Sequence, residues 1–337
     1  MSAVGVVIIG RNEGERLVRC LLSVRQSVRP DARIVYVDSG SSDGSVAAAA
    51  GAGAIVVDLD MTRPFTAARA RNAGRAALPA ACGYIQFVDG DCMLQPDWLA
   101  RAAAALDADD GLAAVFGRRR EVAPAASLYN WLCDIEWAVA PGPARYFGGD
   151  VMIRAAALDQ AGGYPAEMIA GEEPDLAMRL RKRGWRLECV AGEMTLHDAA
   201  IRYFGQWWRR TTRSGHAYAE LAARHGGKGY SDYRRRLVGV FGLGCLPFVG
   251  GLLLVAGLSF AGPSWAGAGA ILLALPVIQY VRLVVKGWRQ RPLSEAAAIA
   301  AFLLAAKPAQ ALGAGRYAMA RLTGKRSALI EYKEGVA

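Results

Sequence analysis

The sequence has no charged side chain over one long stretch, since residues 237–281 contain no Asp, Glu, Lys or Arg. A helix that crosses the apolar core of a bilayer needs about 20 apolar residues, so this stretch is long enough for two helices. The tripeptide Gly-Pro-Ser at residues 262–264 interrupts it near the middle, as a tight turn would. We therefore expect a membrane hairpin with helices over residues 238–260 and 265–285.

Several motifs of other protein classes are also missing. The six cysteines form no CxxC pair and have no regular spacing, which argues against a zinc site or a disulfide framework and fits a reducing cytosolic location. No GxGxxG follows the first apolar run and no GxxxxGK[ST] occurs, so the phosphate-binding loops of dinucleotide-binding and P-loop proteins are absent. The N-terminus has no basic segment followed by a long apolar core, so we expect no signal peptide.

The net charge of +10 is unevenly distributed. Residues 1–201 carry 21 Lys and Arg against 25 Asp and Glu, whereas residues 202–236 carry 9 against 2 and residues 282–337 carry 10 against 3. The excess of basic residues therefore flanks the uncharged stretch, as expected for cytoplasmic flanks of membrane helices that contact anionic lipid headgroups. The N-terminal part has no basic surface, so we expect no nucleic-acid partner.

Short apolar runs and helical patterns alternate in the first part of the chain. Runs rich in β-branched or aromatic residues occupy residues 4–9, 33–37, 54–57 and 84–88, with apolar residues at helical spacing between the first two. This alternation predicts a parallel α/β sheet, which binds ligands at the carboxyl ends of its strands.

Polar clusters follow three of these runs, at residues 11–13, 38–43 and 89–91. In the last of them, the octapeptide YIQFVDGD ends in Asp89 and Asp91 on either side of a glycine. Two such carboxylates need a counter-charge if they are buried, and oxygen ligands suit Mg²⁺ or Mn²⁺. The alternative is a plain turn, because Asp-Gly is also a hairpin signal.

Basic and amide side chains lie just before this octapeptide, in the segment TAARARNAG at residues 66–74. Arg69 and Arg71 could meet a phosphate or a base, or they could form the solvated face of a helix whose alanines pack inward. Both alternatives remain open at this point.

The order of the motifs resembles a known enzyme family. Between about residue 4 and about residue 200 the chain contains, in order, VVIIGRNE, VDSGSSDGS, ARNAG, FVDGDC, FGGDVMIR and GGYPAEMIAGEEPDLAMRLRKRGW. This series resembles a family 2 glycosyltransferase of the inverting type with the GT-A fold. The resemblance implies a GT-A catalytic domain at 1–201. The apolar and basic segments after it predict an amphipathic interfacial helix and basic juxtamembrane segment at 202–236, two transmembrane helices at 237–285, and an interfacial or re-entrant helix with a basic cytosolic tail at 286–337.

The resemblance also implies roles for individual residues. The aspartate that ends the second strand would contact the nucleotide; it corresponds to Asp38, although Ser39 stands where relatives usually have a second aspartate. The metal ligands would be Asp89, Asp91 and His197, holding Mn²⁺ or Mg²⁺ against the donor diphosphate, although a structural role for His197 stays open. The residues expected to bind the nucleotide sugar are Arg11, Glu13, Asp38, Arg69, Arg71, Asn72, Asp89 and Gly90.

The acidic motif Gly-Glu-Glu-Pro-Asp at residues 171–175 would supply the catalytic base, with Glu173 in that position and Glu172 and Asp175 beside it. Pro174 favours the first position of a helix that Gly184 would close, and acids favour the first turn. Glu172 and Asp175 could therefore simply be helix N-terminal acids.

For the acceptor we expect two groups of residues. Gly148, Gly149 and Asp150 would line its side of the site, whereas Trp131, Glu136 and Trp137 could either join them or pack internally. The segment from Gln206 resembles the QxxRW motif of processive synthases, but an arginine stands in the tryptophan position, which favours transfer of a single sugar. Trp207 and Arg210 could bind the acceptor or anchor the helix at the membrane surface.

A third apolar segment, residues 296–312, is interrupted by Lys307 and Pro308. If it crossed the membrane, the basic tail after it would lie outside, against the positive-inside rule. We therefore predict an interfacial or re-entrant helix and a cytosolic tail.

The sequence thus predicts a metal-dependent glycosyltransferase, multi-pass in the inner (plasma) membrane with its catalytic domain on the cytosolic side. Its partners would be a nucleotide sugar, with UDP-sugar favoured, a lipid-linked polyprenyl acceptor of envelope or exopolysaccharide synthesis, and membrane lipids. Two alternatives remain: a polyprenyl-phosphate glycosyltransferase, and a non-catalytic membrane subunit that binds nucleotide sugars.

Overall fold

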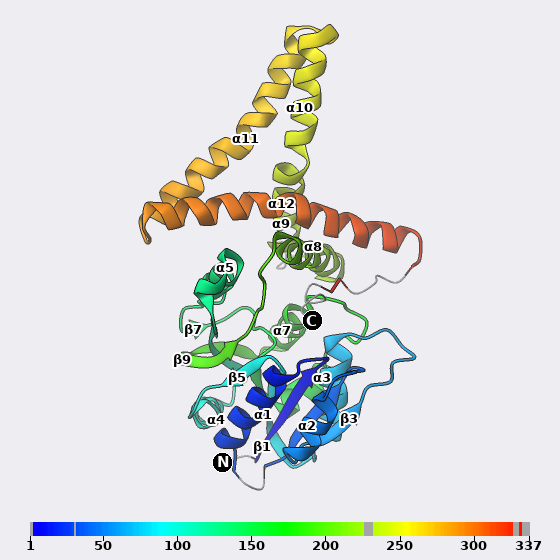
Figure 1. Cartoon of the computed structure of the whole chain (residues 1–337), viewed down its shortest axis with the longest axis vertical. Helices are drawn as coiled ribbons and strands as arrows, with labels where there is room; N and C mark the ends of the chain where they lie inside the picture. The colour runs from blue at the N-terminus through cyan, green and yellow to red at the C-terminus, as the bar shows by residue number, and fades with distance from the viewer. Residues whose placement is uncertain (1–2, 30–31, 226–231, 326–329, 332–337) are drawn as a thin grey trace. The chain divides into compact units, whose positions relative to one another are not determined.

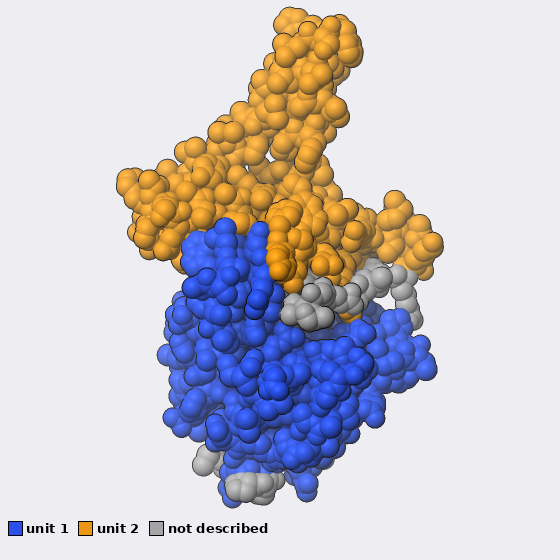
Figure 2. Space-filling view, viewed as in Figure 1, with its two compact units in different colours: residues 1–202 blue, residues 203–337 orange. Residues whose placement is uncertain are grey.

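The computed structural model describes residues 3–29, 32–225, 232–325 and 330–331 (Figure 1). The chain divides into two compact units, residues 1–202 and 203–337 (Figure 2). The elements of the first unit are β1 (Ala3–Gly10), α1 (Glu15–Ser27), β2 (Ile34–Asp38), α2 (Ser45–Gly51), β3 (Ile55–Asp58), α3 (Ala67–Ala77), β4 (Cys82–Asp89), β5 (Cys92–Leu94), α4 (Trp98–Ala108), β6 (Leu112–Glu121), η1 (Pro124–Ala126), α5 (Leu128–Glu136), β7 (Gly142–Pro143), β8 (Val151–Arg154), α6 (Ala155–Gln160), α7 (Glu172–Lys182) and β9 (Arg186–His197).

The first unit is built on a nine-stranded sheet in the order β3-β2-β1-β4-β8-β6-β9-β5, with β7 paired to β9. β1 pairs in parallel with β2 and β4, and β2 pairs in parallel with β3, so the predicted parallel α/β arrangement is confirmed for these four strands. The rest of the sheet is mixed, because β8 runs antiparallel to both β4 and β6 and β5 runs antiparallel to β9.

The central position of β1 explains its composition and places the ligand site. Val6, Val7 and Ile8 are fully buried, as expected for a strand covered on both faces. α3 packs against β1 and β2, and α1 packs against β5. The chain order reverses beside β1, whose neighbours are β2 on one side and β4 on the other. Such a reversal opens a crevice at the carboxyl ends of the strands, where α/β sheets bind ligands.

The octapeptide that ends β4 does not form a hairpin. Gly90 follows the strand and its N–H donates to the carbonyl of Ile9, while β5 pairs with β9. A side chain at Gly90 would lie 3.1 Å from that carbonyl oxygen, which accounts for glycine between the two aspartates. The turn therefore carries the chain from β4 directly across the end of β1.

The second unit is helical, with α8 (Phe204–His225), α9 (Asp232–Gly244), α10 (Leu246–Ala256), η2 (Gly257–Ala261), α11 (Pro263–Trp288) and α12 (Leu293–Leu322). Within the described residues, three helical segments are long and apolar enough to cross a membrane: Asp232–Phe260, Pro263–Trp288 and Leu293–Leu322. The predicted turn is confirmed, since Gly262 has φ +91° and α11 begins at Pro263. The apolar segment that Lys307 and Pro308 interrupt in the sequence lies within one continuous helix, α12, which passes through both residues.

The reason for the continuous helix is the composition around Pro308. Alanine dominates this part of α12, and alanine has the highest helix propensity. A proline in an apolar helix is tolerated when neighbouring groups satisfy the freed carbonyl. A proline therefore did not mark the end of this helix.

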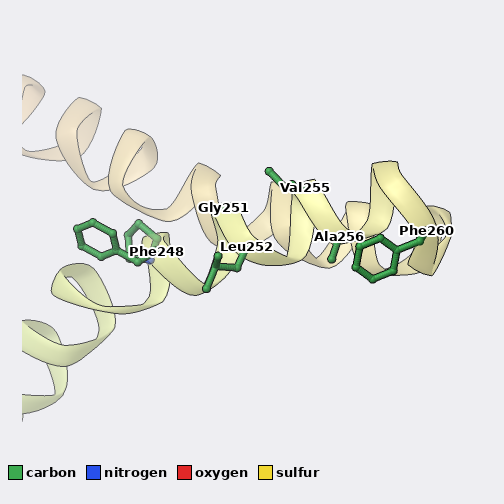
Figure 3. Close-up of a pocket in the computed structure, with 7 residues that line it drawn as sticks. Phe248, Gly251, Leu252, Val255, Ala256 and Phe260 are labelled. Atoms are coloured by element: carbon green, nitrogen blue, oxygen red, sulfur yellow. The ribbon is translucent and has the colours of Figure 1, made fainter.

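α10 and η2 present an apolar groove on the hairpin (Figure 3). Its lining consists of Pro247, Phe248, Gly251, Leu252, Val255, Ala256 and Phe260. Leu252 and Phe260 are largely exposed, as expected for side chains that face lipid rather than water.

Candidate active site

The ends of β1 and β2 are held together by hydrogen bonds between their loops. Asn12 lies in the left-handed region at φ 53°; its N–H donates to Oγ of Ser41 at 2.9 Å, and its Oδ1 accepts from the N–H of Ser42 at 2.7 Å. Asp43 accepts from the N–H of Gly14 at 3.0 Å. The structure thus brings two of the three predicted polar clusters side by side at the end of the sheet.

Asp38 supports this loop with both of its carboxylate oxygens. Oδ1 accepts from the hydroxyl of Tyr36 at 3.0 Å, and Oδ2 accepts from the N–H groups of Gly40 and Ser41 at 2.9 and 2.8 Å. The side chain is buried. Its observed contacts therefore shape the turn after β2, on which the predicted nucleotide contact would depend.

Arg71 is the centre of a buried cluster of carboxyl groups. It projects from α3, whose first turn is capped by Oγ1 of Thr66, and it is only 2% exposed. Its guanidinium lies 2.9 Å from Oδ1 of Asp89, 3.1 Å from Oε1 of Glu172 and 3.2 Å from Oε1 of Glu173. Arg71 is therefore not on a solvated helix face; it links the end of β4 to the acidic motif.

Arg119 on β6 is a second cation of this site, and the sequence analysis missed it. Its guanidinium lies 2.8 Å from Oδ2 of Asp150 and 3.5 Å from Oδ2 of Asp89. Asp150 also accepts from the backbone N–H of Asp89 and from the hydroxyl of Thr195. The available signal was the run of three arginines at residues 118–120 directly after an apolar segment, where a central strand cannot leave all three in water.

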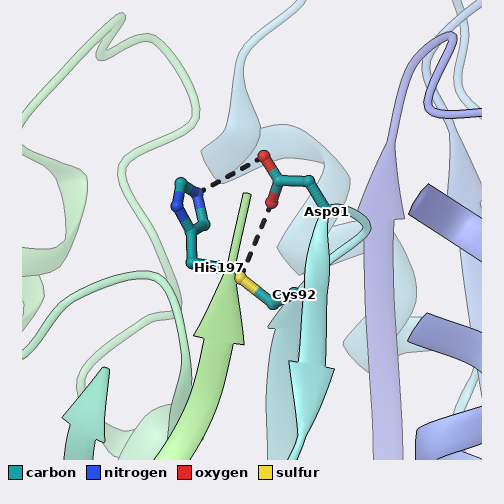
Figure 4. Close-up of side chains that lie close together, drawn as sticks. All are labelled: Asp91, Cys92 and His197. Carbon is teal, nitrogen blue, oxygen red and sulfur yellow. Dashed lines mark hydrogen bonds and ion pairs between the residues drawn. The ribbon is translucent and has the colours of Figure 1, made fainter. Parts of the chain in front are cut away.

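A separate cluster surrounds the second aspartate of the octapeptide (Figure 4). Nε2 of His197, at the end of β9, lies 3.3 Å from Oδ2 of Asp91, and the thiol of Cys92 donates to Oδ1 of Asp91 with an Sγ–Oδ1 distance of 3.6 Å. All three residues are buried. Trp137 packs edge-on against the imidazole at 4.6 Å, so this candidate acceptor residue covers the histidine.

Burial changes the acid–base properties of both clusters. It raises the pKa of Glu173 to about 7, with the charge of Glu172 adding to the rise and Arg71 opposing it. Burial and the nearby charge of Arg119 lower the pKa of His197 to about 4, so its imidazole is neutral near pH 7. A carboxyl group that titrates near neutral pH can act as a general base, and a neutral imidazole can bind a cation.

The helix α7 begins two residues earlier than expected. Pro174 was predicted at the first helical position, but the helix starts at Glu172 after Gly171, which has φ +85°. The three acids of the motif therefore all lie in the first turn, where the helix dipole stabilises negative charge. Gly184 follows the helix at φ +88°, as predicted.

Known proteins are similar to this chain in sequence and in fold. Residues 5–135 match the family model described as glycosyl transferase family 2. Over these residues, the N-terminal unit is similar to members of glycosyl transferase family 2. The pre-mycofactocin glycosyltransferase of Mycobacterium tuberculosis is 29% identical over 239 residues, which cover 66% of this chain and 48% of that protein. The chain thus spans about half the length of the curated relatives it matches.

Solved structures confirm the GT-A fold of the N-terminal unit. The mannosyltransferase PcManGT from Pyrobaculum calidifontis, in complex with GDP-Man and Mn²⁺, superposes with a TM-score of 0.56 at 20% identity, covering 92% of this chain and 87% of that one. A mycobacterial protein gives a TM-score of 0.50 at 20% identity, covering 67% of this chain and 75% of that one.

Two further residues predicted to bind the donor lie at the edges of these clusters. Arg69 donates to the backbone carbonyls of Asp60, Arg63 and Pro64, so it holds the loop before α3. Asn72 exchanges two hydrogen bonds with the backbone of Tyr164. Both residues therefore shape the site from outside.

The other predicted side chains have mostly local partners. Glu13 pairs with Arg16, and Arg11 is exposed in the loop after β1. Asp175 pairs with Arg179 at 2.7 Å one turn along α7, which favours the structural alternative for this acid. Trp207 and Arg210 belong to α8 in the second unit.

Gly149 lies close to the contact between Asp89 and Arg71, the arginine that pairs with the candidate base Glu173. A side chain there would meet Oδ2 of Asp89 at 2.5 Å and Nη2 of Arg71 at 2.6 Å, whereas nothing lies within 4 Å of the corresponding position at Gly148. Glycine at 149 is therefore required for the arginine to reach the aspartate.

The predicted trio of metal ligands is divided in the structure. Within the described residues, the clusters that could hold a cation are Asp91, Cys92 and His197, and Asp89, Cys92 and Asp150. Asp91 and His197 fit a cation, because their donor atoms face one another in a buried position. Asp89 instead faces two guanidinium groups, which already supply its counter-charge.

Proposed function

We propose that this chain is an inverting glycosyltransferase that transfers one sugar from a nucleotide-sugar donor to a lipid-linked acceptor. The observation that carries the proposal is the partly buried carboxyl group of Glu173, whose pKa is raised to about 7 and which is linked through Arg71 to Asp89. The general preference of α/β sheets for binding ligands at the carboxyl ends of their strands supports a donor site next to this group.

In the proposed reaction, Glu173 accepts the proton of the acceptor hydroxyl while that oxygen attacks the anomeric carbon of the donor. The bond from this carbon to the diphosphate oxygen breaks in the same displacement, which inverts the configuration. Arg71 holds Glu173 in place, and Arg119 holds Asp150 and Asp89. The two guanidinium groups also lower the negative charge near the departing diphosphate.

Asp91 and His197 are the residues that would hold Mn²⁺ or Mg²⁺, and such a cation would neutralise charge on the leaving diphosphate. A neutral imidazole and a carboxylate match the donor atoms that Mn²⁺ accepts in proteins. Asp89 would act on the site through Arg71 and Arg119, with which its carboxylate pairs.

For the donor we propose a UDP-sugar. Ser39, in place of the usual second aspartate after β2, and the GDP-Man bound to PcManGT make GDP-mannose the first competitor to test. A panel of UDP- and GDP-sugars with turnover and binding measured together would separate an enzyme from a nucleotide-sugar-binding subunit, which would bind without turnover.

The three helices long enough to cross a membrane and their basic flanks support a lipid-linked acceptor. We propose that the protein is multi-pass in the inner (plasma) membrane, that its catalytic unit lies on the cytosolic side, and that its product belongs to envelope or exopolysaccharide synthesis. A polyprenyl phosphate is the alternative acceptor.

Glu173→Gln tests the proposal, with Glu172→Gln as the neighbouring control. Loss of a general base should lower turnover about 10²–10⁴-fold. Glu172→Gln should remain active and should shift the pH profile to lower pH, because the charge of Glu172 raises the pKa of Glu173. Full activity of Glu173→Gln with a hydroxyl acceptor would refute the role of Glu173; activity with a polyprenyl phosphate alone would support that alternative, because a phosphate acceptor needs no base.

A further inference from the structure

Cys92 is the first residue of β5, and it is completely buried beside the octapeptide. The pairing of β5 with β9 sets Cys92 opposite His197 in the register of the sheet. Figure 4 shows the carboxylate of Asp91 between the thiol and the imidazole. Backbone pairing therefore fixes a sulfur, an oxygen and a nitrogen donor in one buried cluster.

Two separations within this cluster are comparable with the edges of a coordination site. In a tetrahedral site with metal–sulfur bonds of about 2.3 Å and metal–nitrogen or metal–oxygen bonds of about 2.0–2.1 Å, ligand atoms lie roughly 3.3–3.6 Å apart. Here Nε2 of His197 lies 3.3 Å from Asp91 and Sγ of Cys92 lies 3.6 Å from Asp91, on its other oxygen. One donor atom from each of the three residues lies within 4.8 Å of the other two.

A second observation concerns the histidine. Among the residues that the structure describes, Nδ1 of His197 is buried and has no hydrogen-bond partner, so the ring is not fully satisfied as a structural histidine. Its Nε2 is directed at the carboxylate beside the thiol (Figure 4). The imidazole is thus held by only one polar contact, the one that a cation would replace.

We propose that Cys92 supplies a sulfur ligand to the cation site of Asp91 and His197, so that this site binds thiophilic cations such as Zn²⁺ and Cd²⁺ more tightly than Mn²⁺ or Mg²⁺. The inference rests on the proposed cation site, which it extends. Sulfur ligands select soft cations, whereas carboxylates alone favour Mg²⁺ and Mn²⁺. On binding, the S–H bond breaks, the proton passes to the buffer, and the sulfur forms the bond to the cation without any change of oxidation state.

The test uses the full-length protein in detergent and Cd²⁺ alone as the probe. Cadmium bound by a thiolate gives an ultraviolet charge-transfer band, which reports the sulfur ligand independently of activity. The band is expected in the wild type and in Cys189→Ser, and it should be lost in Cys92→Ser. Cys189, on β9, is the matched control because it is buried like Cys92. Its sulfur, however, faces the backbone carbonyls of Val139 and Val190.

A second measurement follows Mn²⁺ by electron paramagnetic resonance while Zn²⁺ is added. Zn²⁺ should displace Mn²⁺ from the wild type, and Cys92→Ser should weaken this competition about tenfold or more. Asp91→Asn should also lose the cadmium band, which provides a second variant if Cys92→Ser fails to fold.

The outcomes separate the inference from the proposed function. A band that survives in Cys92→Ser, or a wild type that binds Mn²⁺ but shows no cadmium band, would overturn the sulfur ligand and leave the glycosyltransferase site intact. A wild type that shows the band but binds no Mn²⁺ would support the sulfur ligand and contradict the proposed Mn²⁺ site.

Discussion

Arg71 and Arg119 are placed so that each lies between two or more carboxyl groups at the end of the sheet. Arg71 bridges Asp89 and the acidic motif, and Arg119 bridges Asp89 and Asp150. A guanidinium group presents several donors in a fixed plane, which a lysine ammonium cannot reproduce. The geometry of the candidate base therefore depends on arginine at both positions.

The close approach at Gly149 gives a direct test of this cluster. Gly149→Ala should lower turnover at least about tenfold, because the new methyl group would lie 2.5 Å from Asp89 and 2.6 Å from Arg71 and would separate them. Gly148→Ala is the matched control, since nothing lies within 4 Å of the added atom. The measurement is the turnover of both variants by steady-state kinetics. Equal turnover would mean that catalysis does not need the contact between Asp89 and Arg71.

The pH dependence of turnover should follow the ionisation of Glu173. A base acts in its deprotonated form, so activity should rise as the pH increases through about 7. Arg71→Gln should move this limb to higher pH, because the positive charge of Arg71 lowers the pKa of Glu173. It should also cost about 3–5 kcal/mol of stability, since buried carboxylates lose their partner.

Arg75→Gln is the control for this experiment. Arg75 lies one helical turn away on α3 and pairs at 2.8 Å with Asp159, whose side chain is 55% exposed. An exposed pair of this kind is worth about 0–1 kcal/mol, so neither the melting temperature nor the pH profile should change much. An unshifted profile in Arg71→Gln would mean that a different group sets the limb.

Sequence patterns pointed to individual residues of the candidate site but not to the contacts between their side chains. Spacing and strand ends pointed to Asp89, Asp91, Glu173 and His197, because polar residues at the ends of parallel strands meet at one edge. The pairing of Asp89 with two arginines, and of Asp91 with His197, arises from β6 and β9, which lie far away in the sequence. Arg119 was missed for the same reason, since its partners are set by the antiparallel pairing of β8 with β6 and β4.

Among the elements, α8 and α12 approach each other closely through two glycines. A side chain at Gly215 would lie 2.0 Å from the carbonyl oxygen of Gln310, and one at Gly313 would lie 1.9 Å from the carbonyl oxygen of Thr212. The backbones of the two helices are therefore in direct contact, as in helix pairs built on small residues.

Gly313→Ala should force these two helices apart and destabilise the second unit by about 1–3 kcal/mol. Gly315→Ala lies two residues further along α12, where an added atom meets nothing within 4 Å, and it should be neutral or slightly stabilising. Thermal unfolding in detergent compares the two variants. Equal melting temperatures would show that this crossing contributes little to stability.

The sequence predicted an element boundary where the local conformation of the backbone determines it, but it did not reveal the contacts between helices. The turn at Gly262 was predicted correctly because a positive φ favours glycine. α12 continues through Pro308 and contacts α8 and α9. These contacts between helices are not visible in a local sequence pattern.

For the whole molecule, we expect the basic flanks to set the direction in which the chain crosses the membrane. We expect a cysteine at Ser264 to be labelled from outside intact cells, and a cysteine at Thr323 to remain unlabelled, because the basic end of α12 should stay in the cytosol. The measurement is labelling with an impermeant thiol reagent in a Cys245→Ser background. Arg326, one of the basic residues that motivate this prediction, lies outside the described residues.

Labelling at Thr323 would show that α12 crosses the membrane and that the chain ends outside. α12 is long and apolar enough for this, so the experiment distinguishes a third crossing from an interfacial helix. Ser264 serves as the positive control, because it is exposed next to the turn of the hairpin.

The arginine cluster also has a consequence for the order in which substrates arrive. The cluster contains four acidic side chains and two arginines, which gives a formal charge of −2 when all are ionised. The acids are Asp89, Asp150, Glu172 and Glu173, and the arginines are Arg71 and Arg119. A bare nucleotide diphosphate entering this region would meet charge of its own sign. The donor should therefore enter together with its cation or after it, which would make binding ordered and would make the cation concentration set the apparent affinity for the donor.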